Sequence, residues 1–195
     1  MRIRLYQPMK NALYQLGLAA LSCAALVVFP NCVPTPGVTI AGKATGGGVL
    51  VKQEPVADGK AAFGFNGSSC DGTTTGRFNY NDKSQSAVTA YGKQGVMANG
   101  TITAFSQCVT AGGCNDSGQT CPEGGFLIEF QYRSNNPNWK DPGTGLVCVV
   151  DGGEGINAPA PDQAGITFTS GAYNGYSAKG PVTGNVQGHL CDDVD

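Results

Sequence analysis

Glycine and proline interrupt this chain so often that a long regular element has little room to form. The sequence holds 30 glycines and 11 prolines, and beyond the N-terminal segment they break it roughly every 8 to 12 residues. No stretch there sustains the apolar repeat of 3.6 residues that marks an amphipathic helix. We therefore expect helix to be a minor component and short strands to build the fold.

Runs of β-branched and aromatic residues between these breakers predict strands. Several runs alternate, so that Ala61, Phe63 and Phe65 share one face and every second residue from Phe126 to Tyr132 shares another. About ten short strands predict one Gly-rich, all-β antiparallel domain, either a sandwich or a barrel. The predicted strands are 38–41, 49–52, 60–66, 76–81, 87–91, 101–105, 126–133, 146–150, 166–169, 173–177 and 182–189.

The N-terminal segment has the pattern of a secretory signal. Arg2, Arg4 and Lys10 precede a stretch without charge from Ala12 to Phe29, which is slightly short for a membrane span. We predict a signal peptide at 1–32, with an uncleaved membrane anchor as the alternative, and an exported β domain at 33–195. The tetrad ending in Cys23 also resembles a loose lipobox, so lipidation of Cys23 is a second alternative.

The charge of the exported part excludes some partners. All 14 acidic residues follow residue 32, and only nine of the 12 basic residues do, so this part has a formal charge of −5. Nucleic acid and anionic lipid are therefore poor partners. We expect contact with a membrane only through the N-terminal segment.

The cysteines predict disulfides. An even number of cysteines in an exported domain favours disulfides over metal ligation, and six cysteines allow 15 pairings. Zinc is the weaker alternative, because no C-x-x-C pair exists and His189 is the only histidine. The six cysteines of the exported domain are Cys70, Cys108, Cys114, Cys121, Cys148 and Cys191.

Two long connections stand out between the predicted strands. Residues 106–125 contain three cysteines and little apolar material, so we expect disulfides to hold this segment. Residues 151–165 contain too much glycine and proline for regular structure. Long loops of this kind are often functional.

The order of several short motifs resembles the post-COAP-1 domain, a bacterial extracellular module. The resemblance covers roughly residues 38–189 and implies an all-β module of secreted or surface proteins, without catalytic residues to carry over. The chain departs from the family in its insertion from Cys108 to Cys121 and in Gly188, where the family more often has an apolar strand residue. The motifs are Gly46-Gly47-Gly48, Phe63-Gly64-Phe65-Asn66, Gly76-Arg77-Phe78-Asn79-Tyr80-Asn81-Asp82, Val150-Asp151-Gly152-Gly153-Glu154-Gly155, Tyr173-Asn174-Gly175-Tyr176 and Gly184-Asn185-Val186-Gln187-Gly188-His189.

Titratable residues that could perform catalysis are few. His189 lies on a predicted terminal strand, where a structural or exposed role is favoured. Asp151, Glu154 and Asp162 share the second long loop, and two of these three carboxylates are a candidate pair for glycoside hydrolysis. With Asn157 they are also a candidate calcium site, although the D-x-D-x-D-G signature is absent. Turn formation is the favoured role of these acids, because Asp before Gly is ordinary turn chemistry.

Trp139, with Tyr132 and Arg133 upstream, is the predicted recognition surface. An indole among Asn-rich turns can stack on a sugar or contact a protein partner. The alternative is that Trp139 folds back and caps one end of the core.

From these features we expect an exported, non-enzymatic structural or adhesive β module of the cell surface or secreted fraction, without a cofactor or metal. Its partner would be a glycan or a surface protein. A carbohydrate- or calcium-binding module is the alternative, and a glycan hydrolase is the second alternative.

Overall fold

The structure is a computed structural model that describes residues 42–109, 113–116, 119–153 and 159–191. The chain divides into two compact units, Met1–Val33 and Pro34–Asp195. The first unit and the predicted strand 38–41 lie outside the described residues. Within the described residues, no helix is long and apolar enough to cross a membrane.

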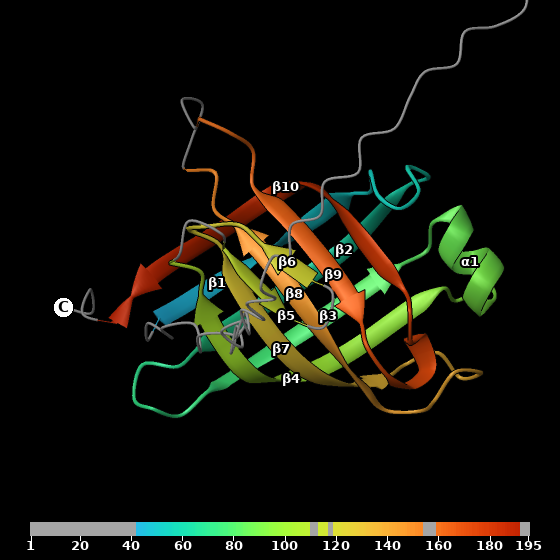
Figure 1. The fold of residues 1–195 in the computed structure, drawn as a ribbon. Coiled ribbons are helices and arrows are strands. Elements are labelled where there is room, and N and C mark those ends of the chain that lie inside the picture. The colour runs from blue at the N-terminus through green and yellow to red at the C-terminus, as the bar shows by residue number, and fades with distance from the viewer. Residues whose placement is uncertain (1–41, 110–112, 117–118, 154–158, 192–195) are drawn as a thin grey trace, which may run out of the picture. The chain divides into compact units, whose positions relative to one another are not determined.

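Eight strands form one closed antiparallel barrel, which decides between the two predicted architectures (Figure 1). Around the barrel the order is β1-β10-β9-β8-β7-β4-β3-β2. Each barrel strand therefore pairs with the barrel strand that follows it in the sequence, and the last one, β10, pairs with the first. Among the described strands, only the short sheet β5-β6 lies outside this ring. The barrel strands are β1 (Gly42–Val51), β2 (Lys60–Ser68), β3 (Thr75–Asp82), β4 (Val96–Gln107), β7 (Phe126–Ser134), β8 (Gly143–Val150), β9 (Gln163–Phe168) and β10 (Ser177–Leu190).

Aromatic side chains fill the barrel interior, as the alternating rows predict. Phe63 and Phe65 of β2 are buried, and the ring of Phe78 on β3 lies 4.2 Å from that of Phe130 on β7. Eight antiparallel strands enclose a space that side chains can fill completely. The grooves lined by described residues lie on the outer wall.

The packing of this interior explains why residue 188 is glycine. Gly188 lies opposite Ala44 in the continuous register between β1 and β10. A Cβ atom at residue 188 would lie 2.2 Å from the Phe126 ring, so only glycine leaves room for that ring. Gly188 therefore leaves space for the Phe126 ring, and the register between β1 and β10 is continuous across it.

Two predicted strands are wrong. Residues 87–91 belong to the helix α1 (Gln85–Tyr91), which lies at one end of the barrel (Figure 1). Val88 and Thr89 prefer strands, but burial of Ala87 favours the helix. The helix ends at Gly92, which has a φ of 79°. Residues 173–177 contain the end of a 3-10 helix, η1 (Gly171–Tyr173), and the start of β10, so the two predicted closing strands are one.

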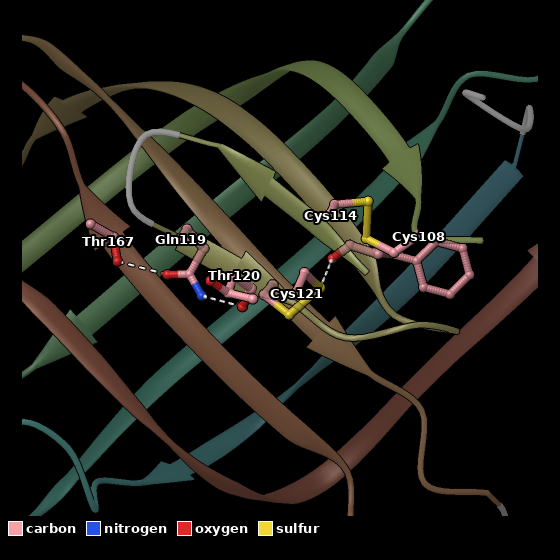
Figure 2. The surroundings of a disulfide bond; sticks show 8 residues. Cys108, Cys114, Gln119, Thr120, Cys121 and Thr167 are labelled. Carbon is pink, nitrogen blue, oxygen red and sulfur yellow. Dashed lines mark hydrogen bonds between the residues drawn. A yellow bond between two sulfur atoms is a disulfide. The ribbon is translucent and has the colours of Figure 1, made fainter. Parts of the chain in front are cut away.

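The first long connection is more ordered than predicted. It forms the hairpin of β5 (Cys114–Asp116) and β6 (Gln119–Cys121), which packs on the outer side of β8 and β9. Gln119 accepts a hydrogen bond of 2.7 Å from Thr167 on β9 (Figure 2). The hairpin covers a small outer cluster, separate from the barrel core, of Cys108, Cys121, Leu127, Leu146 and Cys148.

All six cysteines of the β domain form disulfides, as predicted. The pairs are Cys70–Cys191, Cys108–Cys114 and Cys121–Cys148. The second pair closes a short ring beside the hairpin (Figure 2), and the third ties the hairpin to β8. Residues 151–162, the second long connection, contain no strand or helix among those that are described.

Candidate functional site

A polar groove runs over the outer wall of β3, β4, β7 and β8. Its volume is about 940 Å³. Strand alternation builds it, because Phe78 and Tyr132 turn into the barrel while the residues beside them turn outward. Its lining residues are Arg77, Phe78, Asn79, Asn99, Gly100, Thr101, Gln131, Tyr132, Arg133, Asn135, Pro142, Gly143 and Thr144.

The strand register sets the polar side chains of this groove in two rows. In one row Asn79 lies opposite Asn99, which lies opposite Arg133. In the other row Arg77 lies opposite Thr101, which lies opposite Gln131. Directly opposite residues on one face of a sheet have Cβ atoms about 5 Å apart. The groove therefore presents a continuous array of amide, hydroxyl and guanidinium groups.

These groups have no hydrogen-bond or ion-pair partner among the described residues. This holds for the guanidinium groups of Arg77 and Arg133 and for the side-chain amides of Asn79, Asn99 and Gln131. Asn136, a buried asparagine beyond the groove, differs from these residues because its amide donates hydrogen bonds to two backbone carbonyls. The groove thus holds donors and acceptors that are free to bind a ligand.

The electrostatics of the groove differ from those of the rest of the domain. Arg77 and Arg133 are the only arginines after Arg4 in the sequence, and no acid is among the lining residues. Glu129, the next outward residue on β7 after Gln131, interacts with the hairpin instead. Partial burial raises the pKa of Glu129, and Asp116 raises it further. The local charge of the groove is positive on a chain of negative net charge.

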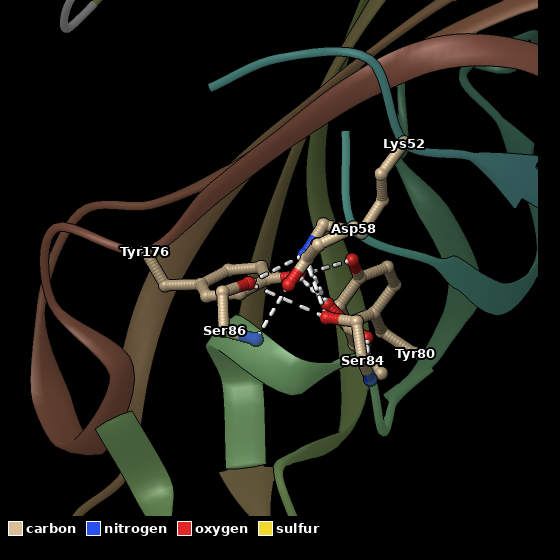
Figure 3. A network of polar contacts seen from close by, with 7 residues as sticks. Lys52, Asp58, Tyr80, Ser84, Ser86 and Tyr176 are labelled. Atoms are coloured by element: carbon tan, nitrogen blue, oxygen red, sulfur yellow. Dashed lines mark hydrogen bonds and ion pairs between the residues drawn. The ribbon is translucent and has the colours of Figure 1, made fainter. Parts of the chain in front are cut away.

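A second polar cluster lies buried beside α1 (Figure 3). The ammonium of Lys52 lies 2.9 Å from Asp58 and 3.1 Å from Asp82. It also donates hydrogen bonds of 2.7 Å to Ser84 and 2.9 Å to Ser86. Lys52 and Asp58 belong to the connection after β1, whereas Asp82 ends β3 and the two serines flank the start of α1. The cluster therefore fastens that connection and the helix to the barrel.

Two tyrosines complete this cluster. Tyr80 and Tyr176 share a hydrogen bond of 2.7 Å, and Tyr176 donates to Asp82. Burial raises the pKa of both phenols, and Asp82 raises both further. Both tyrosines therefore remain neutral donors.

The pKa of Asp58 moves the other way. Burial acts to raise it, but the hydrogen bonds from Lys52 and Ser86 and the charge of Lys52 lower it to about 2, from an ordinary value of 3.8. The Lys52 and Asp82 side chains are 1% and 0% exposed. The cluster is closed to substrates in this structure and is built for stability.

The predicted recognition residues do not form one surface. Tyr132 lies inside the barrel, where its ring stacks on Tyr173 at 5.7 Å and its hydroxyl donates to the Ser170 carbonyl. Arg133, its neighbour, lines the groove. Trp139 is 39% exposed and contacts Tyr91 of α1 edge-on, with ring centroids 5.2 Å apart.

The acids of the second long loop support the backbone. Asp151 accepts a hydrogen bond from the Gly153 amide, which is the turn chemistry predicted for it. Asp162 is buried and accepts from the amides of Gly152 and Val186. Glu154 and Asn157 lie outside the described residues.

The remaining titratable candidates form no site. His189 is exposed on β10, opposite Lys43 of β1. No group of three His, Cys, Asp or Glu residues within the described ranges is placed to hold a metal ion.

Sequence reasoning missed most of the groove. Arg77, Asn79 and Gln131 were assigned to strands, Asn99 lay outside the predicted strand 101–105, and none of the four was assigned to a site. Their signal is a polar residue at every second position of a strand whose other positions are apolar, as in Arg77 and Asn79 around Phe78. That pattern predicts an exposed face, but only the order of strands around the barrel shows which exposed faces adjoin.

Comparisons of this chain with protein-family models, curated proteins and solved structures find no match. The resemblance to the post-COAP-1 domain therefore stays a prediction.

Proposed function

We propose that the chain is an exported, non-enzymatic adhesive module that binds glycans through the groove on β3, β4, β7 and β8. The observation that carries the proposal is the array of amide and guanidinium groups on the outer wall of the barrel that have no partner among the described residues. Sugars present hydroxyl groups in rows, and side chains of these types hydrogen-bond to hydroxyls as donors and acceptors.

Two features support export. Three disulfides join all the cysteines of the β domain, and disulfides persist in oxidising compartments outside the cytoplasm. The basic and then apolar N-terminal segment has the pattern of a secretory signal.

A non-enzymatic role is supported by the state of the acidic side chains. Asp58 and Asp82 share an ion pair with one buried lysine, and Asp151 and Asp162 accept backbone hydrogen bonds. A glycosidase needs two accessible carboxylates that face one bond. None of these four acids has that environment.

A glycan array tests the proposal. The exported β domain should bind a subset of glycans, and the variant N79A/N99A/Q131A should lose that binding because it removes the central amides of the groove. The matched control is T183A/N185A, which truncates exposed polar residues of β10. Equal binding by both variants, or no glycan bound by the unmodified domain, contradicts the proposal.

A further inference from the structure

We propose that the glycan bound in the groove is an anionic polysaccharide, and that Arg77 and Arg133 bind successive acidic groups along it. This inference rests on the proposed function and specifies its ligand class. The shared chemistry is an anionic oxygen pair, as in a carboxylate or a sulfate, which a guanidinium binds with two parallel hydrogen bonds.

The distribution of charge is the first argument. Both arginines of the exported part lie in one groove that has no acidic lining residue, and neither has a carboxylate partner among the described residues. The exported part as a whole carries a formal charge of −5. An anion is therefore attracted to this face and repelled by the negative charge elsewhere. The charge distribution thus determines where an anion binds as well as how tightly it binds.

The spacing of the arginines is the second argument. They lie on β3 and β7, on either side of β4, and Arg77 is opposite Thr101 whereas Arg133 is opposite Asn99. Two strand spacings across the sheet and two residues along it place their Cα atoms about 12 Å apart. At that separation each guanidinium can bind its own acidic group, as a polymer with repeated charges provides.

The groups between the arginines are the third argument. Asn79, Asn99, Thr101 and Gln131 supply neutral hydrogen-bonding groups that match sugar hydroxyls between charged positions. The aromatic lining residues, Phe78 and Tyr132, are 1% and 2% exposed, so the groove has no platform for stacking on a sugar ring. Binding must then depend on charge and hydrogen bonds, and it should weaken as salt is added.

An adjoining hollow extends the positive surface. Arg133 and Asn135 line both hollows, and Lys140 lines the second. Asp141 follows Lys140 in the sequence and is exposed. The polymer would therefore continue from Arg133 towards the connection between β7 and β8, where Lys140 is its next cation.

Isothermal titration of the exported domain with three polymers tests this inference. The probes are polygalacturonate, which carries carboxylates, dextran sulfate, which carries sulfates, and unmodified dextran. We expect binding to a charged polymer and none to dextran. R77Q and R133Q should each weaken binding about tenfold or more, and the double variant should abolish it. The matched control, K43Q/K93Q, removes the same charge from exposed lysines outside the groove and should bind normally.

The outcomes separate the inference from the proposed function. Preference for polygalacturonate or for dextran sulfate identifies the acidic group. Binding to dextran that R77Q/R133Q leaves unchanged overturns the inference but keeps a glycan-binding module. Equal losses of binding in R77Q/R133Q and K43Q/K93Q would show non-specific charge attraction and overturn the inference. Absence of binding to every polymer and every arrayed glycan overturns both. Circular dichroism and urea unfolding of each variant confirm that the barrel is intact.

Discussion

The ammonium of Lys52 is a buried charge held by several partners. It lies between two carboxylates and two serine hydroxyls and has almost no exposed surface. Burial of a charge is costly unless its partners satisfy it, and loss of one partner from a buried ion pair is strongly destabilising. The stability of this end of the barrel therefore depends on the ionisation of its acids.

We predict that Asp58 contributes stability that depends on pH. Its pKa is about 2 in the folded protein and 3.8 without these contacts, so the contribution is complete above about pH 5 and is largely lost as the pH falls towards 2. D58N should lower the free energy of unfolding by about 2 kcal/mol at pH 7 and by much less at pH 2. Urea unfolding across this range measures the difference.

D71N, which alters an exposed acid after β2, is the control and should have little effect at either pH. A loss in D58N that stays constant from pH 7 to pH 2 would contradict the assigned role of Asp58.

Individual residues of the site were predicted unevenly. Strand alternation correctly put Tyr132 on the buried face, and this excludes it from the recognition surface that was also predicted for it. Arg133 was predicted because it adjoins Tyr132 in the sequence. Arg77 was not, because its proximity to Arg133 arises only when β3 and β7 both pair with β4.

Among the elements, strands were easier to predict than the helix. Alternating aromatic rows identified β2 and β7 closely. The helix α1 was missed because a run of seven residues is too short to display a 3.6-residue repeat, and its end signal, Gly92, resembles the turn glycines elsewhere. The β5-β6 hairpin was missed because each strand has only three residues.

We predict that the hairpin can be opened without loss of the barrel. Its outer cluster is separate from the aromatic core, so replacing Cys108, Cys114, Cys121 and Cys148 by Ser should leave the core packed while the hairpin loses its crosslinks. Limited proteolysis should then cut first within residues 106–125 and leave a folded, nicked product. Mass spectrometry identifies the cut.

C70S/C191S, which keeps both hairpin disulfides, should not be cut there first. Degradation of the four-serine variant into small peptides, without a nicked intermediate, would show that the hairpin is integral to the barrel core.

At the scale of the whole molecule, composition predicted the class of fold but not its closure. A sandwich and a barrel share short alternating strands, and they differ in which strands pair at the edges. Here the edges are removed by the pairing of β1 with β10. That pairing joins segments from opposite ends of the domain, so no local pattern reveals it.

The Cys70–Cys191 disulfide also links distant parts of the chain, and we predict that it is the most stabilising of the three. Its cysteines are 121 residues apart, against 6 for Cys108–Cys114. Because a longer closed loop restricts the unfolded chain more, C70S/C191S should lower the free energy of unfolding by about 2–4 kcal/mol, and C108S/C114S by less. Urea unfolding under non-reducing conditions compares them. A larger loss in C108S/C114S would contradict this order.

The pairing of β1 with β10 also governs how a nascent chain can fold. Of the barrel strands, β1 emerges first during synthesis and export and β10 last, so until β10 has emerged β1 has only β2 as a neighbour. The unfinished sheet then has two open edges, whose free backbone groups can pair with other chains. Closure also requires contacts between residues far apart in the sequence, which slows folding. Dilution or a holding chaperone should therefore increase the yield of folded protein more than any single stabilising substitution does.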